Sequence, residues 1–352
     1  MKLVIDCRML DSGGIGSFLS ELIPFLIKEH DCLLIGNEIK LESYKNYKNV
    51  KILNCNIKPF SLTELLHFPK ELLTIINTYD NYFTPYCNIP SGIKIPIYST
   101  IHDIVFLDIP NITSFIGVKV RKFFYQRAIN KSKKIFTVSK FSKKRIQKKL
   151  NCKNKDIIVV YNSAPSYLQT KSEINSKIED IILFIGNIKK HKGLSTLLDA
   201  YEIAKKNGLT SKLTIVGNSK NFRTGDKNII KKIQQEELKG NIVFTGKISN
   251  EELKNLYSIS KYIVQPSFYE GFGIPPLEAM FMGTPALISD IEVFKEIYHD
   301  FPVTFFRVGD PEDLAKKMIL MDTTRINLGK LCDYYSYENS AQIINRAIYG
   351  LI

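Results

Sequence analysis

Residues 267–285 read SFYEGFGIPPLEAMFMGTP, a glycine-containing loop followed by the start of a helix. The β-branched run YIVQ at 262–265 precedes them and predicts a buried strand. Pro275 or Pro276 then opens the helix, because proline suits the first helical position, where its missing N–H costs nothing. A helix that begins at the carboxyl end of a strand presents free N–H groups and a positive dipole end, which together form an anion site.

Glu270 and Glu278 border this predicted anion site, the first from the loop and the second from the first turn of the helix. A carboxylate beside a phosphate would be repelled, so the partners of both glutamates must be hydroxyl or ammonium donors. Sugar hydroxyls fit this requirement. For Glu278 alone, interaction with the positive end of the helix is an equally good interpretation.

Short β-branched runs alternate with helical patterns along the whole chain. One helix is expected at 193–208, where five apolar residues share a face and Gly208 can adopt the left-handed C-cap. The alternation predicts an α/β fold in which helices cover both faces of parallel sheets. The polar segment 163–180 separates the halves, so we expect two doubly wound domains, 1–165 and 166–352, with the last helix able to pack back on the first. The expected strands are 2–5, 32–36, 95–102, 134–139, 157–162, 181–186, 213–217, 241–246, 262–265 and 285–289.

The bulk composition is that of a globular protein, with 44% hydrophobic and 24% charged residues. At 352 residues the chain exceeds the size at which one core keeps growing, which supports two domains. No apolar run reaches about 18 residues and the N-terminus lacks the features of a signal peptide, so we expect a cytoplasmic protein without a membrane-spanning helix. Six scattered cysteines without a Cys-x-x-Cys pair favour reduced thiols over disulfides or a zinc site.

The charge is strongly basic, with 49 Lys and Arg against 35 Asp and Glu, a net +14. Such an excess suits an anionic partner, which can be a nucleic acid, a nucleotide or an anionic membrane. Residues 118–150 contain thirteen Lys or Arg and no acidic residue, and a solvated helix face explains this segment as well as a binding surface does. Aromatic residues interleave with these cations, as in an element that lies in a membrane interface: Phe123, Phe124, Tyr125 and Phe141.

Three further segments place polar residues after predicted strands. In FIGNIKKHKG at 184–193, Lys192 can reach an anion held by the other helix terminus, although basic residues are common after strands. IDCRMLDSGGIGSF at 5–18 places three glycines between strand and helix. Because Leu19 stands where the dinucleotide fingerprint requires Gly or Ala, a Rossmann cofactor is a poor interpretation and a tight turn a good one. His102 follows another strand, but a lone His is more often structural than catalytic.

Together these segments resemble the large retaining glycosyltransferase family with the two-domain GT-B fold, known as glycosyltransferase family four or group one. The resemblance runs almost from end to end, and its most specific part is 244–289 with the Glu-x7-Glu pair. It implies two Rossmann-like domains that face a central cleft, with the nucleotide-sugar donor held by the C-terminal domain. The other matching motifs are GGIG at 13–16, HD at 102–103, TVSKFSKKRI at 137–146, VVYN at 159–162, GNIKKHKG at 186–193 and VGN at 216–218.

The resemblance assigns roles to four charged or titratable residues. It implies that Glu270 hydrogen-bonds hydroxyls of the transferred sugar and that Glu278 holds the ribose hydroxyls. Lys192 would neutralise the diphosphate, and His102 would contact the donor sugar from the opposite domain. Glu270, Lys192 and His102 are therefore the expected catalytic residues.

The resemblance also implies a set of donor-binding positions that act mainly through the backbone or through shape. Gly14 would approach the diphosphate or the acceptor, and Ile248 lies where the family builds its base pocket. Asn187 stands where many members carry Arg, and the candidates to supply the missing charge beside Lys192 are Lys189, Lys190 and His191. The backbone N–H groups expected to face donor sugar and phosphate are those of Phe272, Gly273 and Ile274.

No Asp-x-Asp motif of the kind that holds a metal-bound diphosphate in GT-A transferases is present, so no metal and no cofactor beyond the nucleotide sugar is expected. The family mechanism implied is front-face attack, in which a phosphate oxygen of the leaving group assists the acceptor's proton. That mechanism needs no dedicated protein base.

The sequence thus predicts a retaining, metal-independent glycosyltransferase that moves a hexose from a nucleotide-diphosphate sugar. GDP-mannose is the favoured donor, followed by a UDP- or dTDP-hexose. The expected acceptor is a glycan or lipid-linked molecule in bacterial polysaccharide or lipopolysaccharide (O-antigen) synthesis, at the anionic cytoplasmic face of the inner membrane through 118–150. The alternatives are a basic nucleic-acid-binding protein, which would not need the glutamate pair, and a non-catalytic sugar-nucleotide sensor, which would not need Glu270 or Lys192. We expect no nucleic-acid partner.

Overall fold

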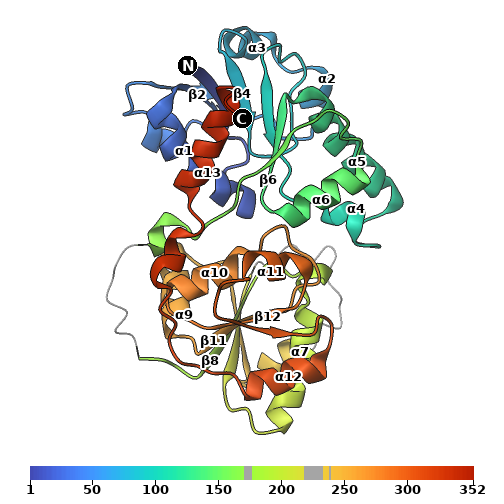
Figure 1. Ribbon diagram of the computed structural model, residues 1–352, viewed down its shortest axis with the longest axis vertical. Coiled ribbons are helices and arrows are strands. Elements are labelled where there is room, and N and C mark those ends of the chain that lie inside the picture. The colour runs from blue at the N-terminus through green and yellow to red at the C-terminus, as the bar shows by residue number, and fades with distance from the viewer. Residues whose placement is uncertain (170–176, 218–232, 238) are drawn as a thin grey trace. The chain divides into compact units, whose positions relative to one another are not determined.

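The computed structural model describes residues 1–169, 177–217, 233–237 and 239–352, which form two compact units (Figure 1). The first unit comprises Met1–Asn162 and Ser336–Ile352, and the second comprises Ser163–Tyr335. The sequence placed the division at 165/166 and left the last helix able to pack back on the first domain, and the structure groups 336–352, which contain that helix, with the first unit. Part of the expected linker and the last residue of the VGN motif, Asn218, lie outside the described residues.

The first unit is built on a seven-stranded parallel sheet. Its strands are β1 (Lys2–Asp6), β2 (Asp31–Gly36), β3 (Val50–Asn54), β4 (Asn81–Thr84), β5 (Ile97–Thr100), β6 (Lys134–Thr137) and β7 (Ile157–Val159). Their order is β3-β2-β1-β4-β5-β6-β7, so the chain builds outward from β1 to β3, returns beside β1 at β4 and continues to β7. The place between β1 and β4 is the topological switch point, where doubly wound sheets bind ligands.

Helices cover both faces of this sheet. They are α1 (Gly14–Glu29), α2 (Leu62–Leu66), α3 (Lys70–Ile76), α4 (Val105–Asp108), α5 (Phe115–Lys131), α6 (Lys140–Lys149), α13 (Tyr337–Ile348) and the short 3-10 helix η1 (Glu42–Tyr44). Helices α1 and α13 pack in one core cluster, and residues of α5 and α6 pack in the cluster on the other face (Figure 1).

Helix α13 belongs to the first unit because its apolar side chains fall on one helical face. Tyr337, Ala341, Ile344 and Ile348 are buried in the same cluster as α1. A hydrogen bond of 2.9 Å between the Nε2 of His30 and the Oδ1 of Asn345, and one of 3.3 Å from the Tyr98 hydroxyl to the Ile348 carbonyl, add to this packing. The last helix therefore completes the core of the first unit.

The second unit repeats the same plan with a six-stranded parallel sheet in the order β10-β9-β8-β11-β12-β13. Its strands are β8 (Ile181–Ile185), β9 (Lys212–Val216), β10 (Ile242–Gly246), β11 (Tyr262–Gln265), β12 (Ala286–Ser289) and β13 (Val303–Phe306). Its helices are α7 (Leu194–Lys206), α9 (Asn250–Ile259), α10 (Ile274–Phe281), α11 (Glu292–Ile297) and α12 (Pro311–Ile319), with the 3-10 helices η2 (Ser166–Leu168), η3 (Lys190–Lys192) and η5 (Gly329–Asp333). The switch point of this sheet lies between β8 and β11.

The two doubly wound parallel sheets confirm the predicted fold class. Helix α7 also confirms the pattern at 193–208, since its five predicted apolar residues are buried and Gly208 has a φ of 93°. Three strands were not among those expected: β3, β4 and β13. Strand β4 reads NYFT, too short and too polar at its ends to be recognised, yet all four residues are buried because it lies at the centre of the sheet.

Candidate active site

The loops after β8 and β11 leave the second sheet at its switch point and come into close contact there. Gly193 makes this contact possible, because it has a φ of 69° and a Cβ atom at this position would overlap the carbonyl oxygen of Pro266. The Phe268 N–H also donates to the His191 carbonyl oxygen, at 2.8 Å. These backbone contacts fix Lys192, on the first loop, beside Glu270 on the second.

Lys192 and Glu270 form a bidentate ion pair. The Lys192 Nζ lies 2.7 Å from one carboxylate oxygen of Glu270 and 2.8 Å from the other. The Ser267 hydroxyl donates to the same carboxylate at 2.7 Å, and the Gln265 amide lies at 3.3 Å. Glu270 is buried, whereas the Lys192 side chain remains 22% exposed, so the ammonium group is still accessible from solvent.

Glu278 lies on α10, in the second turn and not in the first turn as the sequence suggested, because the helix begins four residues earlier at Ile274. This position disfavours the interpretation of Glu278 as a dipole-complementing residue, since that effect is confined to the first turn. The Tyr257 hydroxyl, from α9, donates to Glu278 Oε2 at 2.5 Å. Burial raises the pKa of Glu278 from 4.5 to about 7, and the hydrogen bond from Tyr257 opposes this rise.

The loop between Glu270 and α10 is held in place by α11. Gly273 has a φ of 87°, and a Cβ atom there would overlap the ring of Phe294. The Tyr298 hydroxyl donates to the Gly273 carbonyl and accepts a 3.1 Å hydrogen bond from the Leu277 N–H. The fully buried Tyr298 therefore fixes the start of α10. Pro275 and Pro276 have no N–H, so the N–H groups that this helix start can offer to an anion are those of Gly273 and Ile274.

The remaining predicted donor-binding residues of the second unit are placed as follows. Phe272 is buried, with its ring 5.2 Å from that of Tyr335, so it can contribute only through its backbone. Ile274 is the first residue of α10, and Ile248 is half-buried between β10 and α9. Asn187 is exposed, and its carbonyl accepts from the Lys189 N–H at 2.8 Å.

His191 does not supply the charge that Asn187 lacks. Its ring is buried, and this burial together with the neighbouring Lys192 lowers the pKa of His191 to about 4. The imidazole is therefore neutral near pH 7. Lys189 and Lys190, both exposed on the same loop, remain the candidates for this charge.

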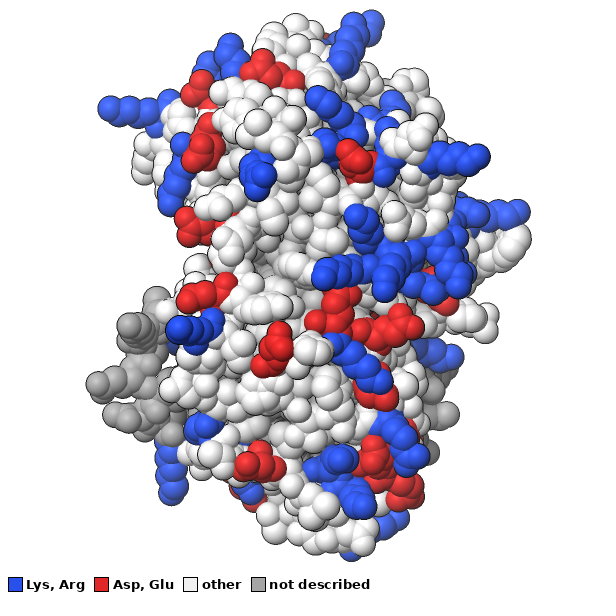
Figure 2. Space-filling view, viewed as in Figure 1, with Lys and Arg blue, Asp and Glu red and all other residues white. Residues whose placement is uncertain are grey.

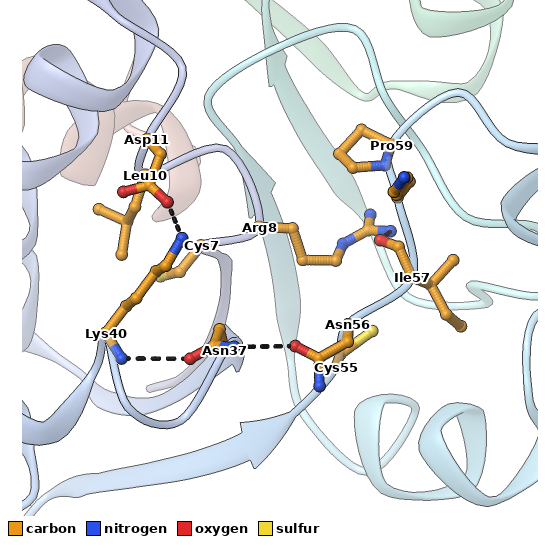
Figure 3. A pocket seen from close by; sticks show the side chains of 11 residues that line it. Cys7, Arg8, Leu10, Asp11, Asn37, Lys40, Cys55, Asn56, Ile57 and Pro59 are labelled. Atoms are coloured by element: carbon orange, nitrogen blue, oxygen red, sulfur yellow. Dashed lines mark hydrogen bonds and ion pairs between the residues drawn. The ribbon is translucent and has the colours of Figure 1, made fainter.

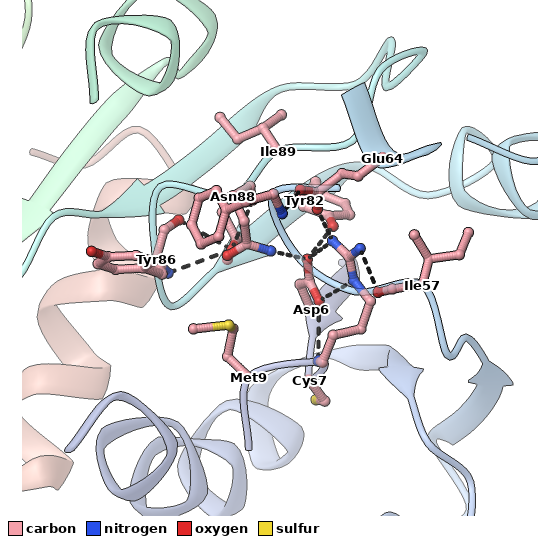
Figure 4. A network of polar contacts seen from close by, with 12 residues as sticks. Asp6, Cys7, Met9, Ile57, Glu64, Tyr82, Tyr86, Asn88 and Ile89 are labelled. Atoms are coloured by element: carbon pink, nitrogen blue, oxygen red, sulfur yellow. Dashed lines mark hydrogen bonds and ion pairs between the residues drawn. The ribbon is translucent and has the colours of Figure 1, made fainter. Parts of the chain in front are cut away.

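In the first unit, a buried ionic network ties the end of β1 to its neighbours (Figure 4). Asp6 accepts from Arg8 Nη2 at 2.6 Å, from the Tyr82 hydroxyl at 2.8 Å and from the Asn88 amide at 3.0 Å. Arg8 also pairs with Glu64 at 2.7 Å, and all three charged side chains are at most 2% exposed. The network holds the loop that leads into the GGIG motif.

The glycines of GGIG divide into two kinds. Gly13 has a φ of 55°, and a Cβ atom at Gly16 would overlap the Leu10 carbonyl, so both are required by the local turn. Gly14 meets neither condition: it is exposed at the first position of α1, and nothing lies within 4 Å of the place that a Cβ atom would take. Its predicted contact with diphosphate or acceptor stays a prediction, but a turn requirement does not explain this glycine.

His102 follows β5 in the first unit. Its Nε2 lies 2.8 Å from the Pro85 carbonyl, and its ring meets Phe18 edge-on at 4.9 Å. Burial lowers the pKa of His102 to about 4, so the ring is neutral and donates through Nε2–H to the carbonyl. His102 is therefore a fixed neutral side chain that does not act as a general acid near pH 7.

The basic segment 118–150 spans α5, β6 and α6, where Figure 2 shows a gathering of Lys and Arg side chains over α6. Of the four aromatic residues predicted to lie in a membrane interface, only one is exposed on the surface. Phe124 and Tyr125 are buried in the core of the first unit and Phe141 is half-buried, because they fall on the inner faces of α5 and α6. Phe123 is 57% exposed. Other large apolar side chains of α5 are exposed beside it: Phe115, Ile116 and Val120.

Within the described residues, no cluster of three or more His, Cys, Asp or Glu could hold a metal ion. In the same residues, no helix has the length and apolar character that crossing a membrane requires. The sequence did not identify four residues that orient the site: Gln265, Ser267, Tyr257 and Tyr298. Gln265 ends the predicted strand and Ser267 begins the quoted stretch, so both could have been suspected from their place at the carboxyl end of a strand, whereas the tyrosines carry no local signal.

Two family models match the chain. "Glycosyl transferases group 1" covers residues 168–338, and "Glycosyltransferase Family 4" covers residues 12–164. The O-antigen chain mannosyltransferase RfbU of Salmonella typhimurium is 32% identical over 200 residues, which is 56% of this chain and 53% of that protein. The O-antigen chain mannosyltransferase B of Escherichia coli is 25% identical over 261 residues, 71% of this chain and 66% of that protein. The chain thus spans about half to two thirds of these relatives.

Solved structures with the same fold cover nearly the whole chain. Anabaena Alr3699/HepE in complex with UDP and glucose has a TM-score of 0.74 at 16% identity, over 99% of this chain and 100% of that one. The apo form of the lipopolysaccharide outer core galactosyltransferase WaaB has a TM-score of 0.62 at 18% identity, over 100% of both chains. At these identities the likeness concerns the fold, while the two family models match both units. The chain therefore belongs to the group-one, family-four glycosyltransferases, with the GT-B fold.

Proposed function

We propose that the protein is a retaining, metal-independent glycosyltransferase that moves a hexose from a nucleotide-diphosphate sugar to a glycan or lipid-linked acceptor. The observation that carries this proposal is the set of three charges at the switch point of the second sheet. Lys192 and Glu270 are paired there at 2.7 Å, and Glu278 is buried on the helix that starts beside them. A cation for the diphosphate and two carboxylates for hydroxyl groups are the parts that this reaction needs.

The Lys192–Glu270 pair prepares the site for the donor. In the absence of a ligand each charge compensates the other, so neither is left unpaired in a partly buried site. When a sugar nucleotide binds, sugar hydroxyls donate to Glu270 and replace one of the two hydrogen bonds that the Lys192 ammonium makes to this carboxylate. Lys192 then turns toward the diphosphate and stabilises the negative charge that grows as the glycosyl bond breaks.

Glu278 holds the ribose through a carboxylate that Tyr257 orients. Its pKa of about 7 means that the unligated protein holds this group partly protonated at neutral pH. Ribose hydroxyls are donors and stabilise the ionised form, so donor binding completes the ionisation. Phosphate charge is met by Lys192 and the start of α10, which makes a metal ion unnecessary, and the leaving phosphate assists the acceptor's proton in front-face attack.

GDP-mannose is the favoured donor, and UDP- and dTDP-hexoses follow. The names of the mannosyltransferase relatives support mannose, and the UDP bound to the Anabaena protein keeps UDP-sugars as the second choice. The O-antigen relatives support an acceptor in bacterial surface polysaccharide synthesis. The nucleic-acid alternative is weakened because two of the aromatic residues it would use, Phe124 and Tyr125, are in the core.

We place the enzyme at the anionic face of the inner membrane, with α5 as the docking element. Phe115 and Ile116 are each 72% exposed, and Phe123 is 57% exposed. Lys119 and Lys122 are exposed between them, and the ammonium of Lys119 lies 4.5 Å from the centre of the Phe115 ring. Apolar side chains flanked by lysines suit the headgroup boundary of an anionic leaflet, where each cation contributes about 1 kcal/mol.

The donor proposal is tested by the thermal stability of the protein with GDP-mannose, UDP-glucose and dTDP-rhamnose. A ligand at a hundred times its Kd stabilises the fold by about 2.7 kcal/mol. We expect GDP-mannose to raise the Tm most and Lys192→Ala to abolish the effect. Lys206→Ala, an exposed lysine on α7, is the matched control. A protein that no sugar nucleotide stabilises would contradict the proposal.

Membrane docking is tested by flotation with phosphatidylglycerol and phosphatidylcholine liposomes at low and high salt, beside a competing oligonucleotide. We expect salt-sensitive binding to the anionic liposomes that is lost in a Phe115→Ser, Phe123→Ser variant. Leu320→Ser, Leu351→Ser is the control, since those leucines are 70% and 67% exposed elsewhere. Tight binding of the oligonucleotide without any liposome binding would favour the nucleic-acid alternative.

A further inference from the structure

A cavity of about 170 Å³ lies in the first unit, at the carboxyl ends of β1, β2 and β3 (Figure 3). This volume corresponds to roughly six water molecules at ~30 Å³ each, enough for one small polar molecule. Its walls are the three loops that follow those strands, 7–11, 37–40 and 55–59. The carboxyl ends of parallel strands are where open α/β sheets bind their ligands.

The walls of this cavity are fixed by buried contacts. The backbone hydrogen bonds between neighbouring strands continue into the loops that follow them. The Cys7 N–H donates to the Ile35 carbonyl at 2.7 Å, and the Cys55 N–H donates to the Gly36 carbonyl at 2.8 Å. Arg8, held by Asp6 and Glu64, donates to the Ile57 carbonyl at 3.3 Å and so joins the first loop to the third. The cavity is therefore a preformed feature of the unit.

The charges around the cavity are nearly balanced. Arg8 is compensated by its two buried carboxylates, and Lys40 forms an ion pair with Asp11. Lys58 is the remaining cation of the lining. A site built for a phosphate would present several uncompensated cations and no carboxylate. The carboxylate of Asp11 in this lining instead favours a neutral ligand.

The polar groups of the lining that are left for a ligand can form hydrogen bonds with hydroxyl groups. Asn37 uses its carbonyl oxygen to accept from the Ile39 N–H at 3.1 Å, and its amide donates to Asn56 Oδ1 at 3.1 Å. Within the part of the chain that the structure describes, Asn56 thereby keeps both its N–H donors, and Lys58 its ammonium, for a ligand. Asp11 keeps one carboxylate oxygen as an acceptor. A hydroxyl both donates and accepts, so it can satisfy both kinds of group.

We infer that this cavity is a subsite for one neutral sugar ring of the acceptor. Asn56 and Lys58 donate to its hydroxyls, Asp11 accepts from one, and the ring lies against Pro59 of the third loop. The loop that carries Asp11 leads directly into Gly13 and Gly14. The inference rests on the proposed function, since it assumes a saccharide acceptor.

The inference is tested by saturation-transfer NMR on the full chain with methyl α-D-mannopyranoside and methyl β-D-glucopyranoside, with inorganic phosphate as competitor. The test variant is Asn56→Ala, Lys58→Ala. The control is Asn339→Ala, Lys51→Ala, which removes an exposed amide and an exposed lysine elsewhere in the same unit. We expect saturation transfer to at least one glycoside, unaffected by phosphate, to fall about tenfold in the test variant and to persist in the control.

The inference would be overturned if the wild type showed saturation transfer to neither glycoside. It would also be overturned if the two variants showed equal transfer, or if phosphate displaced the glycoside. The Tm shift with GDP-mannose is measured on the same samples, and we expect it to be the same in all three proteins. If the Tm shift is absent while glycoside binding behaves as expected, the donor proposal fails and the saccharide subsite stands. If the Tm shift is present and glycoside binding is not, the subsite alone fails.

Discussion

Donor binding should depend on pH through Glu278. Burial raises the pKa of this carboxyl to about 7 in the unligated protein, and ribose hydroxyls that donate to the carboxylate return it to its ordinary range or below. Binding therefore requires loss of a proton below pH 7, and affinity falls nearly tenfold for each pH unit. Relative to pH 8, the Kd for GDP-mannose should rise about tenfold at pH 6 and about a hundredfold at pH 5.

The contribution of Glu278 to the stability of the unligated fold should change with pH in the opposite direction. Since the folded pKa of Glu278 is higher than the unfolded one, its contribution to stability is fully present below pH 4.5 and is lost as the pH rises through about 7. The loss amounts to about 3 kcal/mol for a rise of two to three pKa units. Burial lowers the folded pKa of His102 and His191 from 6.5 to about 4, so each of them adds stability as the pH rises from 4 to 6.5 and opposes Glu278. The contribution of Glu278 is therefore taken from the difference in stability between the wild type and a variant that lacks this carboxyl.

Isothermal titration calorimetry with intact GDP-mannose between pH 5 and 8 measures the affinity, and urea unfolding measures the stability. Glu278→Gln is the matched variant, because its side-chain oxygen can still accept from the Tyr257 hydroxyl. The variant should bind more weakly at pH 8 and lose most of the pH dependence of Kd. An unchanged Kd from pH 5 to 8 in the wild type, or an equal slope in the variant, would refute this reasoning.

The other charged residues lead to three further predictions. Lys192→Ala should lower turnover by roughly 10²–10³-fold, as for a lost oxyanion donor, and turnover within a few-fold of wild type would contradict its role. In steady-state kinetics, Glu270→Ala should mainly lower kcat and Glu278→Ala should mainly raise the KM for the donor; a change in KM alone for both would show that the two roles are assigned wrongly. Arg8→Met leaves two buried carboxylates without their cation and should destabilise the first unit by about 3–5 kcal/mol in urea unfolding. A loss below about 1 kcal/mol would mean that the network relaxes easily.

The loop and helix around Glu270 could be predicted because their signals are local. Glycines and a double proline have backbone preferences that hold in any context, so the stretch at 267–285 indicated a loop followed by α10. The alternation of strands and helices likewise follows from periodicity. The order of the strands was not predicted, and it is this order that brings the loops after β8 and β11 together.

The partners of the site residues could not be predicted because they are distant in sequence. Lys192 and Glu270 are 78 residues apart, and Tyr257 reaches Glu278 from another helix across 21 residues. Nothing in the sequence around Tyr298 indicates that its hydroxyl fixes the start of α10. The burial of Tyr125 was also missed, because the charges on α5 obscure its apolar face and only packing against the sheet reveals which side is inward.

The central claim is that the chain transfers a sugar from a nucleotide donor with retention and without a metal. The direct measurement is incubation of the purified protein with GDP-mannose and a lipid-linked acceptor extract in EDTA, followed by NMR of the new anomeric centre. We expect mannose to be transferred in EDTA with its α configuration kept, and Lys192→Ala to form the product roughly 10²–10³-fold more slowly. A β-linked product, or transfer that requires added manganese or magnesium, would contradict the account.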